Sequence, residues 1–295
     1  MKNCLVKTIK GVVSDDDLLR YGEMKFSVPA GVEKSCQLVV NGGDVSFRLV
    51  GDGYLCLTSG GESVGKTYSL NPSEDIQRMY VHANGDCDIF INDDYNNILT
   101  IANFNFSGDI TPLNYRNKKL QGLLINVANT FVFGEITSTE LLSKAYSISL
   151  PPTVLMGLEC INGNTVLQTL NIKGNTTTSN ISNLTECTDL RELLMQTVVN
   201  VTGNLSSLVP LKKLTNLVMS AVTNITTDIS VADLLVAWLS AGKTGFMTIN
   251  LSTSLPFNGA RLNGSATFST NAIVVKDQNN NTIGTYDGST WTYLS

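Results

Sequence analysis

Histidine is almost missing from this sequence, and charged side chains are scarce. A single histidine, His82, occurs in 295 residues, and Asp, Glu, Lys and Arg together make up 15% of the chain. A histidine-based catalytic triad or metal site would therefore have to use His82 itself. His82 lies in MYVHANGD, at the apparent end of a strand. We expect no metal, no cofactor and no catalytic role for this residue.

Long runs of basic or apolar residues are lacking as well. The longest basic clusters, Lys118-Lys119 and Lys212-Lys213, are interpreted as solvated surface, and the net charge is −5, which argues against a nucleic-acid partner. No stretch approaches the roughly 20 apolar residues of a membrane span, so no membrane insertion is expected. Near the start, Lys7, Lys10 and the acidic run 15–17 interrupt any signal peptide. We expect synthesis in a host cytoplasm without an export signal.

The cysteines do not form a metal-binding or redox pattern. None of the six stands in a C-x-x-C spacing, and each lies among apolar or strand-like residues. We therefore predict small buried side chains with free thiols. The six residues are Cys4, Cys36, Cys56, Cys87, Cys160 and Cys187.

Residues 1–95 have the pattern of a small antiparallel β-sandwich or barrel. Short apolar runs alternate with turn-forming tripeptides, which is typical of all-β domains. The predicted strands are Glu23–Val28, Gln37–Val40, Val45–Val50, Tyr54–Leu57, Met79–His82 and Asp88–Ile91. The predicted turns are Pro29-Ala30-Gly31, Asn41-Gly42-Gly43, Gly51-Asp52-Gly53 and Asn84-Gly85-Asp86.

A literal match to the phosphate-binding pattern G-x-x-x-x-G-K-[ST] occurs in this region. Gly60 is followed after four residues by Gly65-Lys66-Thr67. A working phosphate loop joins a buried parallel strand to a helix. Here Pro72 would disrupt that helix, and no alternating βα units follow. We predict a turn between two β-strands, with a nucleotide site as the alternative.

Three acidic clusters could in principle serve a cation or paired-carboxylate chemistry. They are Asp15-Asp16-Asp17, Asp86 with Asp88, and Asp93-Asp94. Asn84, Asp86 and Asp88 resemble a calcium loop only loosely, because the closing glutamate is absent. The first cluster is interpreted as a helix start. We predict solvated loops, with a bound cation as the alternative.

Self-similarity dominates residues 96–255. The pattern L-x-x-L-x-[LIM] recurs at Leu167, Leu190 and Leu214, with spacings of 23 and 24 residues. Upstream copies start at Leu120 and Ile98, and residues 141–156 form a degenerate copy that contains Pro151-Pro152. Each copy predicts one parallel strand, and the apolar residues of neighbouring copies pack against one another in a shared core. An insertion at Val231–Ser240 has helical spacing and ends at Ala241-Gly242.

These residues resemble the leucine-rich-repeat family in its roughly 24-residue form. The resemblance implies a parallel-strand solenoid that binds other proteins through its strand face. The strict asparagine of that family occurs only at Asn175, and Val198 and Val222 stand at the equivalent positions. We therefore expect the turn after each strand to have a different shape.

Residues 256–295 are predicted to form β-hairpins. Strands are expected at Ala272–Val275, Thr282–Tyr286 and Trp291–Leu294. The ending TYDG…TWTY is similar to the tails of some phage structural proteins. The whole arrangement is similar to virion-associated proteins of tailed phages of the crAss-like group. The resemblance implies a non-enzymatic capsid decoration or head-fibre protein, located in the virion and anchored through residues 1–95.

Aligning the three clear repeats predicts a contact face. Leu194 and Val218 fall side by side as exposed apolar residues, with Arg191 and Asn216 beside them. The alternative is a chance pair that the insertion partly covers. Expected partners are other virion proteins or a host-surface ligand, within a larger assembly or homo-oligomer. The competing functional class is a tail-associated or cell-surface binding module.

Overall fold

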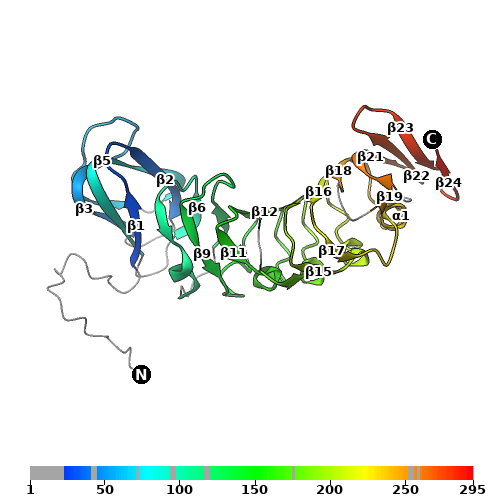
Figure 1. Ribbon diagram of the computed structural model, residues 1–295, viewed down its shortest axis with the longest axis horizontal. Helices are drawn as coiled ribbons and strands as arrows, with labels where there is room; N and C mark the ends of the chain where they lie inside the picture. Colours follow the sequence, from blue (N-terminus) through cyan, green and yellow to red (C-terminus); the bar gives the residue numbers. More distant parts are fainter. Residues whose placement is uncertain are drawn as a thin grey trace, which may run out of the picture.

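The protein is elongated and mainly β (Figure 1). The computed structural model describes residues 23–40, 45–70, 73–93, 98–115, 120–174, 177–251, 256–257 and 260–294. Antiparallel strands lie at both ends of the molecule, and a stack of parallel strands lies between them. The predicted mainly β fold is therefore confirmed. Among these residues, no helix has the length and apolar composition needed to cross a membrane.

The N-terminal strands are organised around one long strand, β5. β5 pairs antiparallel with β1, β2 and β3, and β3 also pairs with β4. Alternate residues such as Phe26, Phe47 and Ile89 are buried, as expected for strands with one face on a core. The bounds are β1 Glu23–Val28, β2 Glu33–Val40, β3 Val45–Cys56, β4 Thr67–Leu70 and β5 Ser73–Asn92.

Two predicted turns are wrong, because they lie inside strands. Gly51-Asp52-Gly53 belongs to β3 and faces Asn84-Gly85-Asp86 of β5, and the register shifts between Gly51 and Gly53. A Cβ on Gly53 would lie 2.5 Å from the carbonyl oxygen of His82. The glycines therefore permit a close backbone approach at a bulge rather than a chain reversal.

Seven strands form the central parallel ladder, with antiparallel β2 and β21 beside its two end strands. Neighbouring strands are in register, so one apolar residue from each strand stacks on the next. This stack is buried throughout and consists of Ile101, Leu123, Ile148, Leu170, Leu193, Leu217 and Ile249. The strands are β6 Ile98–Ala102, β8 Gly122–Leu124, β10 Ser147–Leu150, β12 Thr169–Lys173, β14 Glu192–Gln196, β16 Asn216–Ser220 and β18 Gly245–Asn250.

Shorter parallel ladders and 3-10 helices lie between successive strands of the central ladder. We call one central strand, together with the segment that leads to the next, a coil. β7, β9 and β11 pair in one ladder, and β13, β15 and β17 pair in another. The strands are β7 Ser107–Asp109, β9 Val132–Ile136, β11 Val154–Met156, β13 Ser179–Asn180, β15 Val201–Asn204 and β17 Asn224–Thr226. The 3-10 helices are η1 Thr111–Tyr115, η2 Leu158–Ile161, η3 Ile181–Leu184 and η4 Leu205–Leu208.

The degenerate repeat at 141–156 forms a complete coil. β10 pairs on one side with β8 and on the other with β12, and its Ile148 and Leu150 point into the core. Pro151-Pro152 follows directly after β10, where no ladder hydrogen bond is needed. The strand therefore keeps its place in the ladder although the leucine pattern is lost.

The turn after each strand of the central repeats uses a left-handed residue. Gly174, Thr197 and Ala221 have φ values of 62°, 55° and 56° and follow β12, β14 and β16. Val198 and Val222 come next and are fully buried. A buried apolar side chain thus stands at the position where the resemblance would place an asparagine. Asn175 lies outside the described residues.

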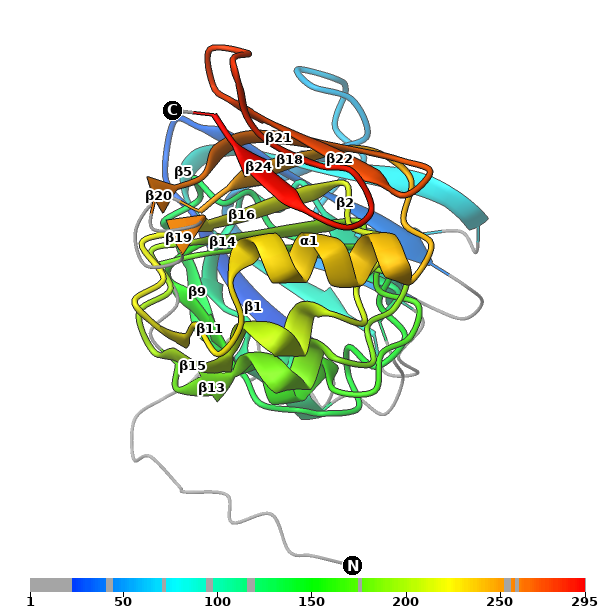
Figure 2. The same cartoon turned by 90° about the vertical axis from the view of Figure 1, so that its right-hand side faces the viewer.

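The predicted helix in the insertion is confirmed as α1 Val231–Ser240. It starts with a capping box, in which Ser230 and Asp233 satisfy each other's backbone N–H groups. Figure 2 shows α1 lying across the C-terminal end of the stack, below the strands of the sheet. Its buried face packs against η4 and the C-terminal strands. The helix therefore covers core that a further coil would otherwise cover.

The last strands continue the sheet in the antiparallel sense. β21 pairs with the final parallel strand β18, and β22, β23 and β24 follow as a meander (Figure 1). The three predicted C-terminal strands are present. The bounds are β19 Pro256–Phe257, β20 Ala260–Arg261, β21 Asn263–Ser269, β22 Ala272–Asp277, β23 Thr282–Tyr286 and β24 Trp291–Tyr293.

One buried apolar cluster runs through all three predicted domains. It extends from Met24 to Val275 and includes residues from each of them. β2 pairs with β6, which connects the N-terminal strands to the parallel ladder in one sheet. The predicted boundaries themselves fall in segments 94–97 and 252–255, outside the described residues.

The cysteines of the described residues are buried and have free thiols, as predicted, and Cys4 lies outside these residues. Burial raises the pKa of Cys160 to about 11 and that of Cys187 to about 12. Burial also raises the pKa of Cys36. A thiolate is thus disfavoured at these positions, because the apolar core does not solvate the charge.

These pKa shifts predict a loss of stability at alkaline pH. In the unfolded chain the thiols ionise near pH 9.0, whereas Cys160 and Cys187 stay protonated in the folded chain. Their contribution is fully present below pH 9 and is lost as the pH rises toward the folded values, by up to about 1.4 kcal/mol per pH unit for each thiol. Urea unfolding at pH 8, 9 and 10 would measure this slope. The double variant Cys160→Ala/Cys187→Ala should show a shallower slope, and an unchanged slope would contradict the assignment.

Candidate functional site

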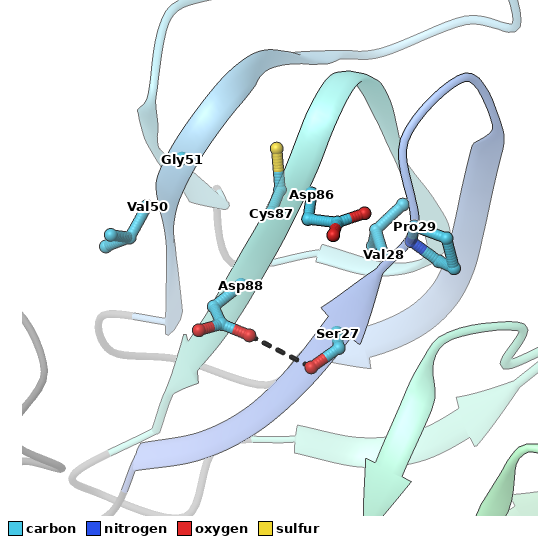
Figure 3. Close-up of a pocket in the computed structure, with 8 residues that line it drawn as sticks. All are labelled: Ser27, Val28, Pro29, Val50, Gly51, Asp86, Cys87 and Asp88. Carbon is cyan, nitrogen blue, oxygen red and sulfur yellow. Dashed lines mark hydrogen bonds between the residues drawn. The ribbon is translucent and has the colours of Figure 1, made fainter.

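A surface cavity lies on the N-terminal strands. It has a volume of about 510 Å³ and opens between β1, β3 and β5 (Figure 3). Its lining includes two carboxylates from β5 and the Ser27 hydroxyl from β1. We call it the acidic hollow, defined by Ser27, Val28, Pro29, Val50, Gly51, Asp86, Cys87 and Asp88.

The carboxylates of the acidic hollow are engaged by neighbouring groups. Asp88 accepts a hydrogen bond from Ser27 Oγ at 2.9 Å (Figure 3). It also pairs with Lys25 Nζ at 2.8 Å. Asp86 accepts from the backbone N–H of Ala30 at 2.9 Å. Within the described ranges, no three His, Cys, Asp or Glu side chains come together as a metal site. The two carboxylates therefore fasten β5 to β1 and to the turn that follows it.

Asp93 departs from the predicted solvated loop. Its side chain is buried and accepts a hydrogen bond from the backbone N–H of Ile98 at 2.9 Å. Satisfying a buried donor in this way ties the end of β5 to the start of β6. Asp15-Asp16-Asp17 and Asp94 lie outside the described residues.

The phosphate-loop match forms the connection between β3 and β4, so the predicted turn is confirmed. β3 and β4 pair antiparallel on either side of it, and Thr67 is the first residue of strand β4 rather than of a helix. The backbone N–H of Gly60 donates to the carboxylate of Glu33 at 2.8 Å, and Ser59 Oγ donates to it at 2.6 Å. These bonds lower the pKa of Glu33, chiefly through Ser59. The Glu33 carboxylate thus already accepts the hydrogen bond from the Gly60 N–H group that a bound phosphate would need.

The two residues singled out by their chemistry have structural surroundings. His82 is half-buried on β5 and stacks on Tyr54, with ring centroids 5.0 Å apart. Lys66 is exposed, and its Nζ donates to the carbonyl oxygen of Gly51 at 2.5 Å. Both contacts hold β3 against neighbouring segments.

The predicted contact residues lie together on two neighbouring strands. Leu194 of β14 stands directly opposite Val218 of β16, and both are half-buried. Asn216 stands two residues before Val218 on the same face, and Arg191 is exposed directly before β14. Stacking in register therefore brings Leu194, Asn216 and Val218 to one face of the sheet, and Arg191 lies at the edge where β14 begins. α1 makes its main contacts elsewhere, with η4, β19 and β22.

A second cavity adjoins this face at the start of the strands. It has a volume of about 380 Å³, and four of its lining residues are cations. Three consecutive coils contribute them, just before β14, β16 and β18. We call it the basic hollow, defined by Arg191, Lys212, Lys213, Thr215, Ala241, Gly242, Lys243 and Thr244.

Lys243 is the buried member of the basic hollow. It is 5% exposed, and its Nζ donates to the carbonyl oxygen of Lys212 at 3.3 Å and to that of Leu214. Burial lowers its pKa, because the core does not solvate an ammonium group. The sequence interpretation treated Lys212-Lys213 as solvated surface and did not single out Lys243. The four cations come from three successive repeats, so they form no local motif in the sequence that could have indicated this cluster.

No protein family matches the chain, and neither a curated protein nor a solved structure matches it. The geometry and chemistry of the chain itself are therefore the basis for a functional proposal.

Proposed function

We propose that the chain is a non-enzymatic interaction protein built on a leucine-rich-repeat-like solenoid. The observation that carries this proposal is the in-register parallel ladder from β6 to β18. Its central coils repeat every 23 or 24 residues, from Thr169 to Glu192 to Asn216. Such arrays present a broad strand face to partners, because every coil contributes residues at the same height.

The proposal divides the chain into three functional parts. Residues 1–95 form a β-sandwich or barrel that anchors the molecule, residues 96–255 form the solenoid, and residues 256–295 form the hairpin tail. Solenoids need covers at both ends, because a terminal coil leaves its apolar edge open. The pairing of β2 with β6 and of β21 with β18 supports this role for the two end units.

The contact face proposed for a partner is centred on Leu194 and Val218. The two side chains are neighbours across the β14–β16 pair, and Arg191 and Asn216 supply polar groups at its edge. Apolar centres with a polar rim are typical of protein–protein interfaces. Asn216 Oδ1 is buried without a hydrogen-bond partner among the described residues, so a partner's donor would satisfy it.

For the biological setting we propose a phage virion component of the capsid decoration or head-fibre type. The support is the similarity of the C-terminal hairpins to phage structural proteins, together with an elongated molecule whose two ends differ (Figure 1). One end would attach to the particle and the other would face outward. The alternative is a tail-associated or cell-surface binding module, which the cation-rich basic hollow favours.

Immunogold labelling of intact particles would test the setting. The particles are those of the phage whose genome carries this reading frame, with pre-immune serum as the control. Label on the capsid is expected for a decoration or head-fibre protein, and label on the tail would favour the alternative. Particles without label, from cells that contain the protein, would overturn both versions.

A further inference from the structure

The basic hollow concentrates positive charge on an acidic protein. The chain has 20 Lys and Arg against 25 Asp and Glu, yet four cations and no carboxylate line this one cavity. Arg191, Lys212-Lys213 and Lys243 precede β14, β16 and β18, so stacked coils place them at one edge of the sheet. Neighbouring strands lie only about 4.8 Å apart, which keeps these charges close together.

Little of this charge is neutralised inside the protein. Lys213 pairs with Asp189 of the preceding coil, and both side chains are exposed. In the described part of the chain, Arg191 and Lys212 form no ion pair, and Lys243 donates to two carbonyl oxygens rather than to a carboxylate. Glu192 follows Arg191 but accepts from Thr169 Oγ1 on the strand face. The cavity therefore attracts an external anion.

A row of exposed polar side chains leads away from the basic hollow. Arg191 N donates to Gln168 O at 2.8 Å, and Gln168 N donates to Tyr146 O at 2.8 Å. These backbone bonds place Tyr146, Gln168 and Arg191 side by side on three successive coils, over about 10 Å at the usual strand spacing. Tyr146 is 42% exposed, so its ring is accessible at this edge.

We propose that this edge binds an acidic oligosaccharide. The carboxylate or sulfate group lies in the basic hollow, where the guanidinium of Arg191 offers two parallel N–H donors and Lys212 adds a second charge. The uncharged sugar rings lie over Gln168 and Tyr146, where the amide bonds to hydroxyl groups and the aromatic ring packs against C–H faces. A small inorganic anion would contact only the basic hollow, whereas the saccharide would also contact Gln168 and Tyr146. The proposal stands independently of any location in a particle.

Isothermal titration calorimetry on the full chain would test the proposal. The probe is a heparin-derived hexasaccharide, compared with inorganic sulfate and with hexaglutamate. We expect the hexasaccharide to bind the wild type saturably and at least tenfold more tightly than sulfate. Arg191→Ala/Lys212→Ala should weaken it at least tenfold. The matched control Lys173→Ala/Lys276→Ala removes the same charge elsewhere and should bind like the wild type.

Tyr146→Ala separates the saccharide from a bare anion. It should weaken the hexasaccharide severalfold and leave sulfate binding unchanged. Three outcomes would overturn the proposal: no saturable binding by folded wild type, equal weakening in the charge-matched control, or hexaglutamate binding as tightly as the hexasaccharide without dependence on Tyr146. The last result would assign the edge to an acidic peptide. Circular dichroism of each variant confirms that the fold is retained.

Discussion

Replacing Trp238 with alanine is expected to lower the free energy of unfolding by about 3–5 kcal/mol. Trp238 is the largest fully buried side chain, on the face of α1 that covers the end of the stack. Its Nε1–H donates to the carbonyl oxygen of Leu208 at 3.1 Å. Leu208 O also accepts from Leu211 N, so the loss comes mainly from the cavity and not from an orphaned carbonyl. Urea unfolding would measure the change, followed by far-UV circular dichroism because the variant removes a tryptophan and alters the fluorescence.

An exposed aromatic residue on β18 provides the control. Phe246 of β18 is 59% exposed, so Phe246→Ala should change stability by less than about 0.5 kcal/mol. Trp238→Phe keeps most of the apolar volume and should lose clearly less than Trp238→Ala. If Trp238→Ala cost no more than Phe246→Ala, the helix would not be a cover for the core.

Asn164→Ala is expected to cost about 2–4 kcal/mol, although the residue lies in a loop. Asn164 is fully buried, and its Nδ2 donates to the carbonyl oxygens of Leu142 and Ala145, each at 2.8 Å. Its Oδ1 accepts from Val166 N at 3.1 Å. Without the amide, Ala145 O and Val166 N lose these bonds, whereas Leu142 O keeps the one from Ala145 N. Equilibrium unfolding in urea would give the difference.

The matched control lies two residues away in the same loop. Asn162 is exposed, so Asn162→Ala should stay within about 0.5 kcal/mol of the wild type. Asn164→Asp tests the mechanism, because it keeps the shape but removes both N–H donors. A loss for Asn164→Asp much smaller than that for Asn164→Ala would mean that packing, rather than hydrogen bonding, gives the residue its importance.

The regular parts of the fold could be predicted because their patterns are local. The spacing at Leu167, Leu190 and Leu214 predicts the positions of β12, β14 and β16, and the helical spacing of the insertion predicts α1. The predicted contact residues came from the same alignment, and the structure places Leu194, Asn216 and Val218 on neighbouring strands and Arg191 directly before one of them. A repeat makes such alignment possible, since equal spacing along the chain becomes equal height in the stack.

The wrong predictions share a different cause. Gly51-Asp52-Gly53 and Asn84-Gly85-Asp86 have turn-forming residues, yet each supports a bulge because the other lies opposite it. Asp93 is buried because Ile98, across a connection, supplies its donor. Local propensity does not contain the partner strand, so tertiary pairing can overrule it.

The sequence by itself determined that this protein is mainly β and where the parallel strands of the three clear repeats run, and it favoured a turn between two strands for the phosphate-loop match. These conclusions follow from periods of two residues and of about 24 residues, which are properties of the chain alone. Only the tertiary structure decided that one sheet continues through the whole molecule, and that Arg191, Lys212 and Lys243 share one cavity. The reason is physical: backbone hydrogen bonds between coils bring residues a full repeat apart to within a strand spacing, and no local pattern records which side chains meet there.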